Sequence, residues 1–126
     1  MLLVKHYIGI SPIHGTGVFA SEFIPKGTIT WRLEDRFDKI VKPEDMNGLP
    51  LSARQFLEMY ALYCEDVQGY VLCSDHAKHM NHSLQANTRA HDDYDIAVRD
   101  IQVGEEITCN YFDFDPESAA KLSPGA

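Results

Sequence analysis

Turn-forming residues interrupt the first third of the chain at short intervals and leave room only for short strands between them. Residues 9–12 read Gly-Ile-Ser-Pro and residues 24–27 read Ile-Pro-Lys-Gly, and both are typical of turns because glycine and proline favour turn backbone angles. The segments 2–8 and 28–33 are rich in β-branched and aromatic residues, and short strands spaced about ten residues apart are typical of mainly β folds. The sequence therefore predicts a mainly β framework.

The same pattern returns near the other end of the chain. Residues 94–101 alternate like a half-buried strand, with Ala97 and Arg99 on one of its faces. A turn at residues 103–105 then leads into an apolar segment at 107–111, which we predict to be the last strand.

The middle of the chain has helical periodicity instead. Ser52 with Gln55 three residues later is typical of a capping box, so we expect a helix from Ser52 to about Cys64. An apolar stripe lies on one face of this helix: Phe56, Met59, Tyr60 and Tyr63. We interpret the stripe as core packing rather than as a ligand-binding surface.

Length and charge limit the domain organisation and the partners. The chain has 126 residues and a mass of 14.2 kDa, which predicts a single domain over residues 1–126, with a flexible tail over about 115–126. Eleven Lys and Arg against nineteen Asp and Glu give a net charge of −8, which disfavours binding to nucleic acid or an anionic membrane. A basic partner fits this charge, although solubility alone also explains it.

Targeting signals and cysteine pairs are not evident. The sequence contains no apolar run of transmembrane length, and residues 1–6 do not resemble a signal peptide. The three cysteines include no CxxC pair, so we expect an intracellular, reducing location.

A metal site deserves consideration because four ligand-type residues occur three positions apart. They are Cys73, His76, His79 and His82. Four residues at this spacing drift around a helix and alternate on a strand, so they cannot all converge on one ion. We therefore predict no metal site, with a two-residue site at His79 and His82 left open.

Three short motifs have a more informative order. Residues 15–17 read Gly-Thr-Gly between two predicted strands, residues 80–83 read Met-Asn-His-Ser, and residues 104–111 read Gly-Glu-Glu-Ile-Thr-Cys-Asn-Tyr. Each motif alone is weak, since a GxG segment is usually a tight turn. Together, in this order and spacing, they resemble the SET domain of protein lysine methyltransferases, over residues from about 3 to 114.

The resemblance implies a fold and a domain layout. It implies small β-clip-like sheets with a C-terminal pseudoknot, similar to the minimal SET proteins of viruses and bacteria. The segment from about 37 to 69 matches the family's variable insert and is expected to carry one helix. The family's zinc-binding cysteine is replaced by Leu84 and no cysteine follows Tyr111, so no metal is expected.

The resemblance also implies site residues. The expected cofactor is S-adenosylmethionine, and the expected catalytic residue is Tyr111, at the methyl-transfer point. The implied cofactor-binding residues are Gly15, Thr16, Gly17, Trp31, Asn81, His82, Tyr111 and Phe112. The implied substrate-binding residues are Trp31, Tyr70, Cys109 and Phe114.

The implied function is S-adenosylmethionine-dependent methylation of lysine on a basic protein, such as a histone, a histone-like protein or a ribosomal protein. The alternative is a catalytically weak or inactive SET module that binds cofactor or basic peptides, since Leu84 and Cys109 depart from the family pattern. A monomer and a homodimer both stay open. The location would be cytoplasmic in a bacterium, and nuclear or chromatin-associated if histones are the substrate.

Acidic residues gather in or beside the insert. They are Asp35, Asp38, Glu44, Asp45, Glu58, Glu65 and Asp66. A solvated acidic face and a groove for a Lys/Arg-rich peptide both explain them.

Overall fold

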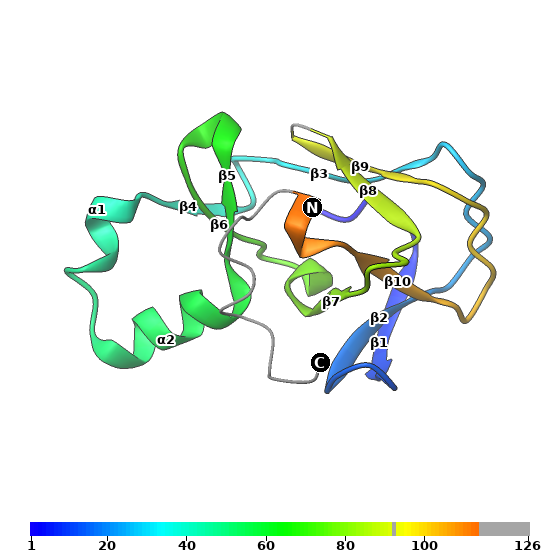
Figure 1. Ribbon diagram of the computed structural model, residues 1–126, viewed down its shortest axis with the longest axis horizontal. Helices are drawn as coiled ribbons and strands as arrows, with labels where there is room; N and C mark the ends of the chain where they lie inside the picture. The colour runs from blue at the N-terminus through cyan, green and yellow to red at the C-terminus, as the bar shows by residue number, and fades with distance from the viewer. Residues whose placement is uncertain (92, 114–126) are drawn as a thin grey trace.

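The computed structural model describes residues 1–91 and 93–113, and these form short strands and few helices (Figure 1). The strands are β1 (His6–Ile10), β2 (Thr16–Ala20), β3 (Ile29–Arg32), β4 (Lys39–Val41), β5 (Leu62–Cys64), β6 (Gly69–Leu72), β7 (Asn81–His82), β8 (Thr88–His91), β9 (Tyr94–Ala97) and β10 (Glu106–Cys109). The helices are α1 (Pro43–Met46) and α2 (Leu51–Tyr60), with 3₁₀ turns η1 (Glu65–Val67), η2 (His76–His79) and η3 (Tyr111–Asp113). The predicted mainly β architecture is confirmed.

The strands form three small sheets. Their orders are β1-β2-β10-β7, β3-β9-β8 and β4-β6-β5. Neighbouring strands are antiparallel except β7 and β10, which run parallel with Asn81 opposite Thr108 and His82 opposite Cys109. This pairing places two of the sequence motifs side by side. The threaded pseudoknot itself stays a prediction.

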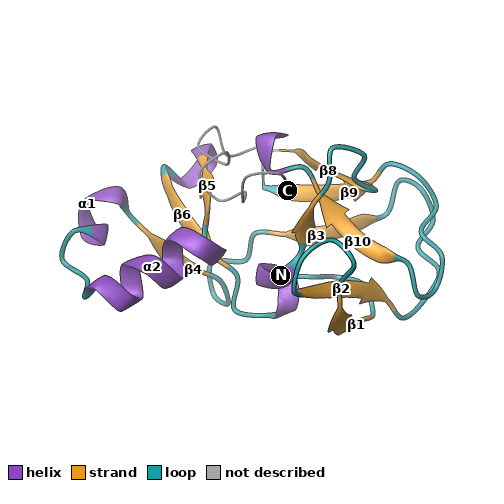
Figure 2. Ribbon diagram, turned by 60° about the horizontal axis from the view of Figure 1, so that its bottom comes forward, coloured by secondary structure: helices purple, strands orange, loops and turns teal. Residues whose placement is uncertain are grey.

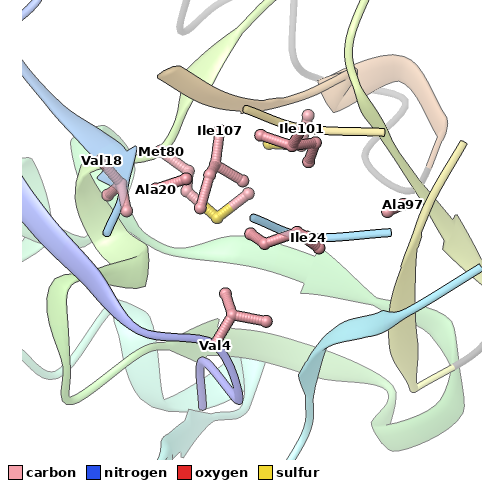
Figure 3. Packing of buried hydrophobic residues seen from close by; sticks show 9 residues of the cluster. Val4, Val18, Ala20, Ile24, Met80, Ala97, Ile101 and Ile107 are labelled. Carbon is pink, nitrogen blue, oxygen red and sulfur yellow. The ribbon is translucent and has the colours of Figure 1, made fainter. Parts of the chain in front are cut away.

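The main hydrophobic core lies between the first two sheets (Figure 3). Its members are Val4, Val18, Ala20, Ile24, Met80, Ala97, Ile101, Ile107 and Cys109. Alternation along β2 turns Val18 and Ala20 inward, and Ile107 of β10 is the direct cross-strand partner of Val18. Burial of each such isoleucine or valine contributes about 1.5–3 kcal/mol, so these residues fix the position of β10.

A second, smaller core stabilises the segment from β4 to β6, residues 39–72, which we call the arm. Val41, Leu57 and Ala61 are buried there, with Tyr70 and Leu72 packed against them. Figures 1 and 2 show α1, α2 and the β4-β6-β5 sheet together at one end of the molecule, away from β1 and β2. The arm coincides approximately with the predicted insert, but it contains α1 as well as the one helix expected.

The helix in the arm differs from its prediction at both ends. α2 begins at Leu51 after an N-cap at Pro50 and has no side-chain cap, so the capping box at Ser52 is wrong. It ends at Tyr60 because Ala61 is extended (φ −84°, ψ 147°), and residues 62–64 form strand β5. Tyr63 therefore lies on a strand rather than on the helix.

The aromatic stripe of α2 is not core. Phe56 and Met59 are 44% and 58% exposed, whereas Leu57 is the buried residue of this helix. The helix covers only one small sheet, and Leu57 with Ala61, four residues on, is enough to fill that contact.

The first strand is also shifted from its prediction. We predict a strand over residues 2–8, but β1 spans His6–Ile10, and Leu2 forms only an isolated bridge with Trp31. Val4 turns into the main core instead, because the chain crosses the core before it pairs with β2. None of the described helices is both long and apolar enough to span a bilayer.

Two carboxylates are buried within residues 1–91 and 93–113, and only one of these two is satisfied by hydrogen bonds. Asp38 accepts from the backbone N–H groups of Glu34 (3.1 Å) and Ser74 (3.3 Å) and from the amino group of Met1 (3.1 Å). Asp95 of β9 is 9% exposed, and no described residue donates a hydrogen bond to its carboxylate. Burial raises the pKa of Asp95 to about 7.

We expect Asp95→Asn to stabilise the protein above pH 7 and to have little effect near pH 4. The pKa of Asp95 in the folded protein exceeds the ordinary value of 3.8, so the folded state binds the proton more tightly. The contribution of Asp95 to stability is therefore most favourable below pH 4 and falls as the pH rises from 4 to 7, by at most about 4 kcal/mol. Urea unfolding of both proteins at pH 4 and pH 8 measures the difference.

The matched control is Asp93→Asn, which removes an exposed carboxylate from the same hairpin. Its unfolding free energy should follow that of the wild type at both pH values. An equal effect of Asp95→Asn at pH 4 and pH 8 would contradict the assignment of a buried, destabilising charge.

Candidate active site

Asn81 ties the Gly-Thr-Gly turn to the two paired strands β7 and β10. Its side-chain amide donates to the carbonyl oxygens of His14 (3.0 Å) and Thr16 (3.2 Å) and to Oε2 of Glu106 (2.9 Å). The side chain is buried, so these bonds are shielded from water. Asn81 therefore joins three segments that lie far apart in the sequence.

Glu106 of β10 holds the same turn from the other side. The hydroxyl of Ser11 donates to both of its carboxylate oxygens, at 2.8 and 2.9 Å. A Cβ at Gly17 would collide with this carboxylate, so only glycine permits the close approach. Gly15 has φ +46°, a left-handed conformation, and faces open space. Sequence reasoning missed Ser11 and Glu106 as members of this site.

Tyr111 lies directly after β10, in the 3₁₀ turn η3, rather than on the predicted strand. Its backbone N–H donates to Nδ1 of His82 (3.1 Å), and its hydroxyl donates to the carbonyl oxygen of Met80 (2.8 Å). Burial raises the pKa of the Tyr111 hydroxyl, so the phenol stays protonated at neutral pH. The hydroxyl of Tyr111 is thus bound to the backbone of the residue that precedes Asn81.

Three aromatic rings gather where β7 meets η3. The ring of His82 lies 5.2 Å from that of Tyr111 and 5.4 Å from that of Phe112. Burial lowers the pKa of His82, which keeps the imidazole neutral and allows Nδ1 to accept the bond from Tyr111. Phe112 is 49% exposed and leaves part of this aromatic cluster open to solvent.

Tyr111 also lines a mostly apolar cavity of about 90 Å³. Of the residues predicted for the site, the cavity is lined by Trp31, Cys109 and Tyr111. The arm adds Met59, Tyr60 and Tyr63, which the sequence analysis assigned to core packing. A cavity of about 90 Å³ has room for a slender alkyl chain.

The remaining predicted residues lie outside this cavity. Gly15, Thr16, Gly17, Asn81 and His82 are connected by the hydrogen bonds and strand pairing described above. Tyr70 packs in the arm with its ring 5.5 Å from that of Tyr63, so it supports the cavity wall rather than lining it. Phe114 lies outside the described residues.

The thiols in the cavity wall are protonated at neutral pH. Burial raises the pKa of Cys73 to about 12 and raises that of Cys109 as well. The indole N–H of Trp31 is buried without a hydrogen-bond partner in the described part of the chain. The charged side chains of the wall are Lys78 and Asp95.

Cys73, His76, His79 and His82, which the sequence analysis considered and rejected as a metal site, do not converge in the described part of the chain. Within residues 1–91 and 93–113, no group of three or more His, Cys, Asp or Glu side chains could hold an ion. His76 and His79 make aromatic contacts instead, with ring separations of 5.4 Å to His6 and 5.6 Å to Tyr60.

Signals for the missed residues exist in the sequence. Asp95 shares a strand face with Ala97. A carboxylate is rarely buried unless it has a partner, so an Asp on a buried strand face is a candidate site residue. Glu106 belongs to the third motif itself. The contribution of the arm could not be read from the sequence, because it depends on how the arm packs beside β3 and η2.

Comparison with known proteins identifies the fold. A candidate histone methyltransferase of Plasmodium falciparum is 25% identical, with a TM-score of 0.63, over 87% of this chain and 95% of that chain. An apo ctPRC2 with two substitutions in Ezh2 has a TM-score of 0.68 at 20% identity, over 94% of this chain. A humanized mutant of the Chaetomium thermophilum Polycomb Repressive Complex 2, bound to an inhibitor, has a TM-score of 0.66 at 20% identity, over 93%.

The two complexes share the fold only, and the match covers 16% of each of those chains. No curated protein matches by sequence. The family model of the SET domain matches residues 15–112, which is more than half of the chain and includes the Gly-Thr-Gly turn, Asn81, His82 and Tyr111. The chain therefore belongs to the SET domain family.

Proposed function

We propose that the protein is an S-adenosylmethionine-dependent lysine N-methyltransferase that acts on a basic protein. The observation that carries the proposal is the position of Tyr111 between two surfaces. Its backbone bonds to His82, the neighbour of the turn-binding Asn81, and its side chain lines the apolar cavity. One residue therefore contacts both the expected cofactor region and the expected acceptor cavity.

The residues near the glycine turn fit S-adenosylmethionine by their chemistry. An adenine ring needs an aromatic or apolar face, which His82 and the exposed ring of Phe112 offer. The amino-acid end of the molecule needs room beside a backbone turn, and the open space at Gly15 leaves that room. When bound, the cofactor supplies a methyl group on a sulfonium centre.

Asn81 contributes to cofactor binding through the turn. Its side-chain amide already donates to the carbonyl oxygens of His14 and Thr16 and to Glu106, so it fixes the turn in its open shape. Trp31 lines the cavity rather than the turn, which favours a role at the acceptor end of the site.

The apolar cavity suits a lysine side chain that must react as a neutral amine. A free lysine has a pKa of about 10.4, so presenting it neutral at pH 7 costs about 4.6 kcal/mol. Walls such as Trp31, Met59 and Cys109 lower this cost because they desolvate the ammonium. Tyr111 orients the amine with its protonated hydroxyl and does not serve as a base.

Exposed acidic residues of the arm favour a basic substrate. They include Glu44, Asp45, Glu58, Glu65 and Asp66, whereas Asp38 is buried and satisfied internally. Such a surface attracts a Lys/Arg-rich segment and weakens its binding as salt increases. Histones, histone-like proteins and ribosomal proteins share this chemistry.

We expect Tyr111→Phe to slow methyl transfer by about 100-fold, because the positioned hydroxyl is lost. Binding of S-adenosylhomocysteine should stay unchanged, since the backbone bond to His82 remains. The assay measures labelled methyl transfer to a panel of histones, histone-like and ribosomal proteins. Tyr7→Phe, at a half-exposed ring of β1, is the control and should keep full activity.

Two outcomes would count against the mechanism. One is the absence of labelling by the wild type across the whole panel. The other is equal labelling by the wild type and Tyr111→Phe.

We expect Asn81→Ala to weaken S-adenosylhomocysteine binding by about tenfold or more, because the turn loses its buried donor. Titration calorimetry measures the affinity, and thermal unfolding verifies that the variant is folded. Asn47→Ala, at an exposed position after α1, is the matched control.

The same calorimetry separates the enzyme from its alternative. A wild type that binds no S-adenosylhomocysteine but binds a lysine-rich peptide would instead be a peptide-binding SET module. A wild-type affinity that Asn81→Ala leaves unchanged would contradict the role given to the turn.

A further inference from the structure

Asp95 places a carboxylate in a cavity that is otherwise almost entirely apolar. The residue lies on the buried face of β9, directly opposite Trp31 of β3 in the strand register. Its side chain is 9% exposed and lines the same cavity as Tyr111 and Cys109. The carboxylate is thus at the proposed acceptor end of the site.

This carboxylate has no direct ion-pair or hydrogen-bond partner among the described side chains. No described cation lies within ion-pair distance of it, and no described donor bonds to it, although its backbone carbonyl accepts from Thr30 (3.5 Å). An ionised carboxylate buried without donors is costly, and a cationic ligand in the cavity would offset this cost.

The other charged and titratable groups near Asp95 come from five places along the chain. Lys78 of η2 shares the cavity wall, Asp113 of η3 adds negative potential, and the amino group of Met1 adds positive potential. The thiols of Cys73 and Cys109 and the hydroxyl of Tyr111 stay protonated. Asp95 is therefore the anionic group of the cavity wall within the described residues.

We propose that Asp95 binds the ammonium group of the acceptor lysine in this cavity and receives its proton before methyl transfer. This inference rests on the proposed methyltransferase function. One N–H bond of the ammonium breaks and one O–H bond forms on Asp95, which leaves a neutral amine and a neutral carboxylic acid. The amine lone pair then forms the N–C bond as the S–C bond breaks, with its electron pair left on sulfur. Asp95 finally returns its proton to water.

The surroundings favour this proton transfer through their effects on both Asp95 and the ammonium. Burial raises the pKa of Asp95 to about 7, which matches a proton acceptor that works near neutral pH. The apolar walls and the sulfonium charge lower the pKa of the incoming ammonium, so the two pKa values approach each other. Ion pairing draws the acceptor in, and proton transfer then removes both charges from the apolar cavity.

The first test uses n-butylammonium as a probe, because it has the four-carbon chain and head group of lysine. The chain has one tryptophan, Trp31, so its indole N–H gives a single NMR signal at the cavity opposite Asp95. At pH 8 we expect n-butylammonium to shift this signal and Asp95→Asn to weaken the affinity by about tenfold or more. Asp93→Asn, the exposed neighbour, should bind like the wild type.

n-Butanol serves as the uncharged probe of the same length. Equal binding of n-butanol by the wild type and Asp95→Asn shows that the cavity is intact in the variant. Equal n-butylammonium affinity in the wild type and Asp95→Asn, or tighter binding of n-butanol than of n-butylammonium by the wild type, would overturn the proposal.

The second test separates this inference from the proposed function. We expect Asp95→Asn to lower kcat/KM for methyl transfer by about tenfold or more, with S-adenosylhomocysteine affinity unchanged. Methyl transfer by Asp95→Asn at the wild-type kcat/KM overturns the inference and leaves the function standing. Ammonium binding that depends on Asp95 in a wild type without methyl transfer supports the cation site and overturns the function.

Discussion

The hydrogen-bonded contact among Asn81, Glu106 and Ser11 is the constraint on which the site depends. These three side chains join the end of β1, the Gly-Thr-Gly turn, and the paired strands β7 and β10. The bonds form only because β10 crosses the core beside β2, where Ile107 packs against Val18. Asn87 reinforces the arrangement, because its buried side chain bonds to the backbone of both Glu106 (2.8 Å) and Thr108 (2.9 Å). Core packing and site geometry therefore cannot be separated.

The described molecule has two cores with different tasks. The main core fixes the turn, β7 and β10, and so sets the position of Tyr111. The smaller core of the arm, around Leu57 and Ala61, supports a helix whose outer residues face the cavity. Met59 and Tyr60 are exposed or half-buried because they line this space rather than fill a core.

The sequence predicted the features of the fold that depend on local motifs. The mainly β fold and the SET family were predicted correctly, and Trp31, Cys109 and Tyr111 do line one cavity. Long-range packing was not predictable. Periodicity placed Phe56 and Met59 on one helix face but did not reveal that this face lacks a covering layer. Alternation placed Asp95 on the same side as Ala97, yet only the tertiary structure shows that this side faces a cavity.

The separate core of the arm has a consequence for divergence within such a chain. Substitutions at Met59, Tyr60 or Tyr63 change the shape of the cavity wall, whereas the buried contacts of Leu57 and Ala61 keep the arm folded. The hydrogen bonds at the glycine turn involve none of these residues. The shape of the cavity can thus change during evolution while the glycine turn stays under a fixed structural constraint.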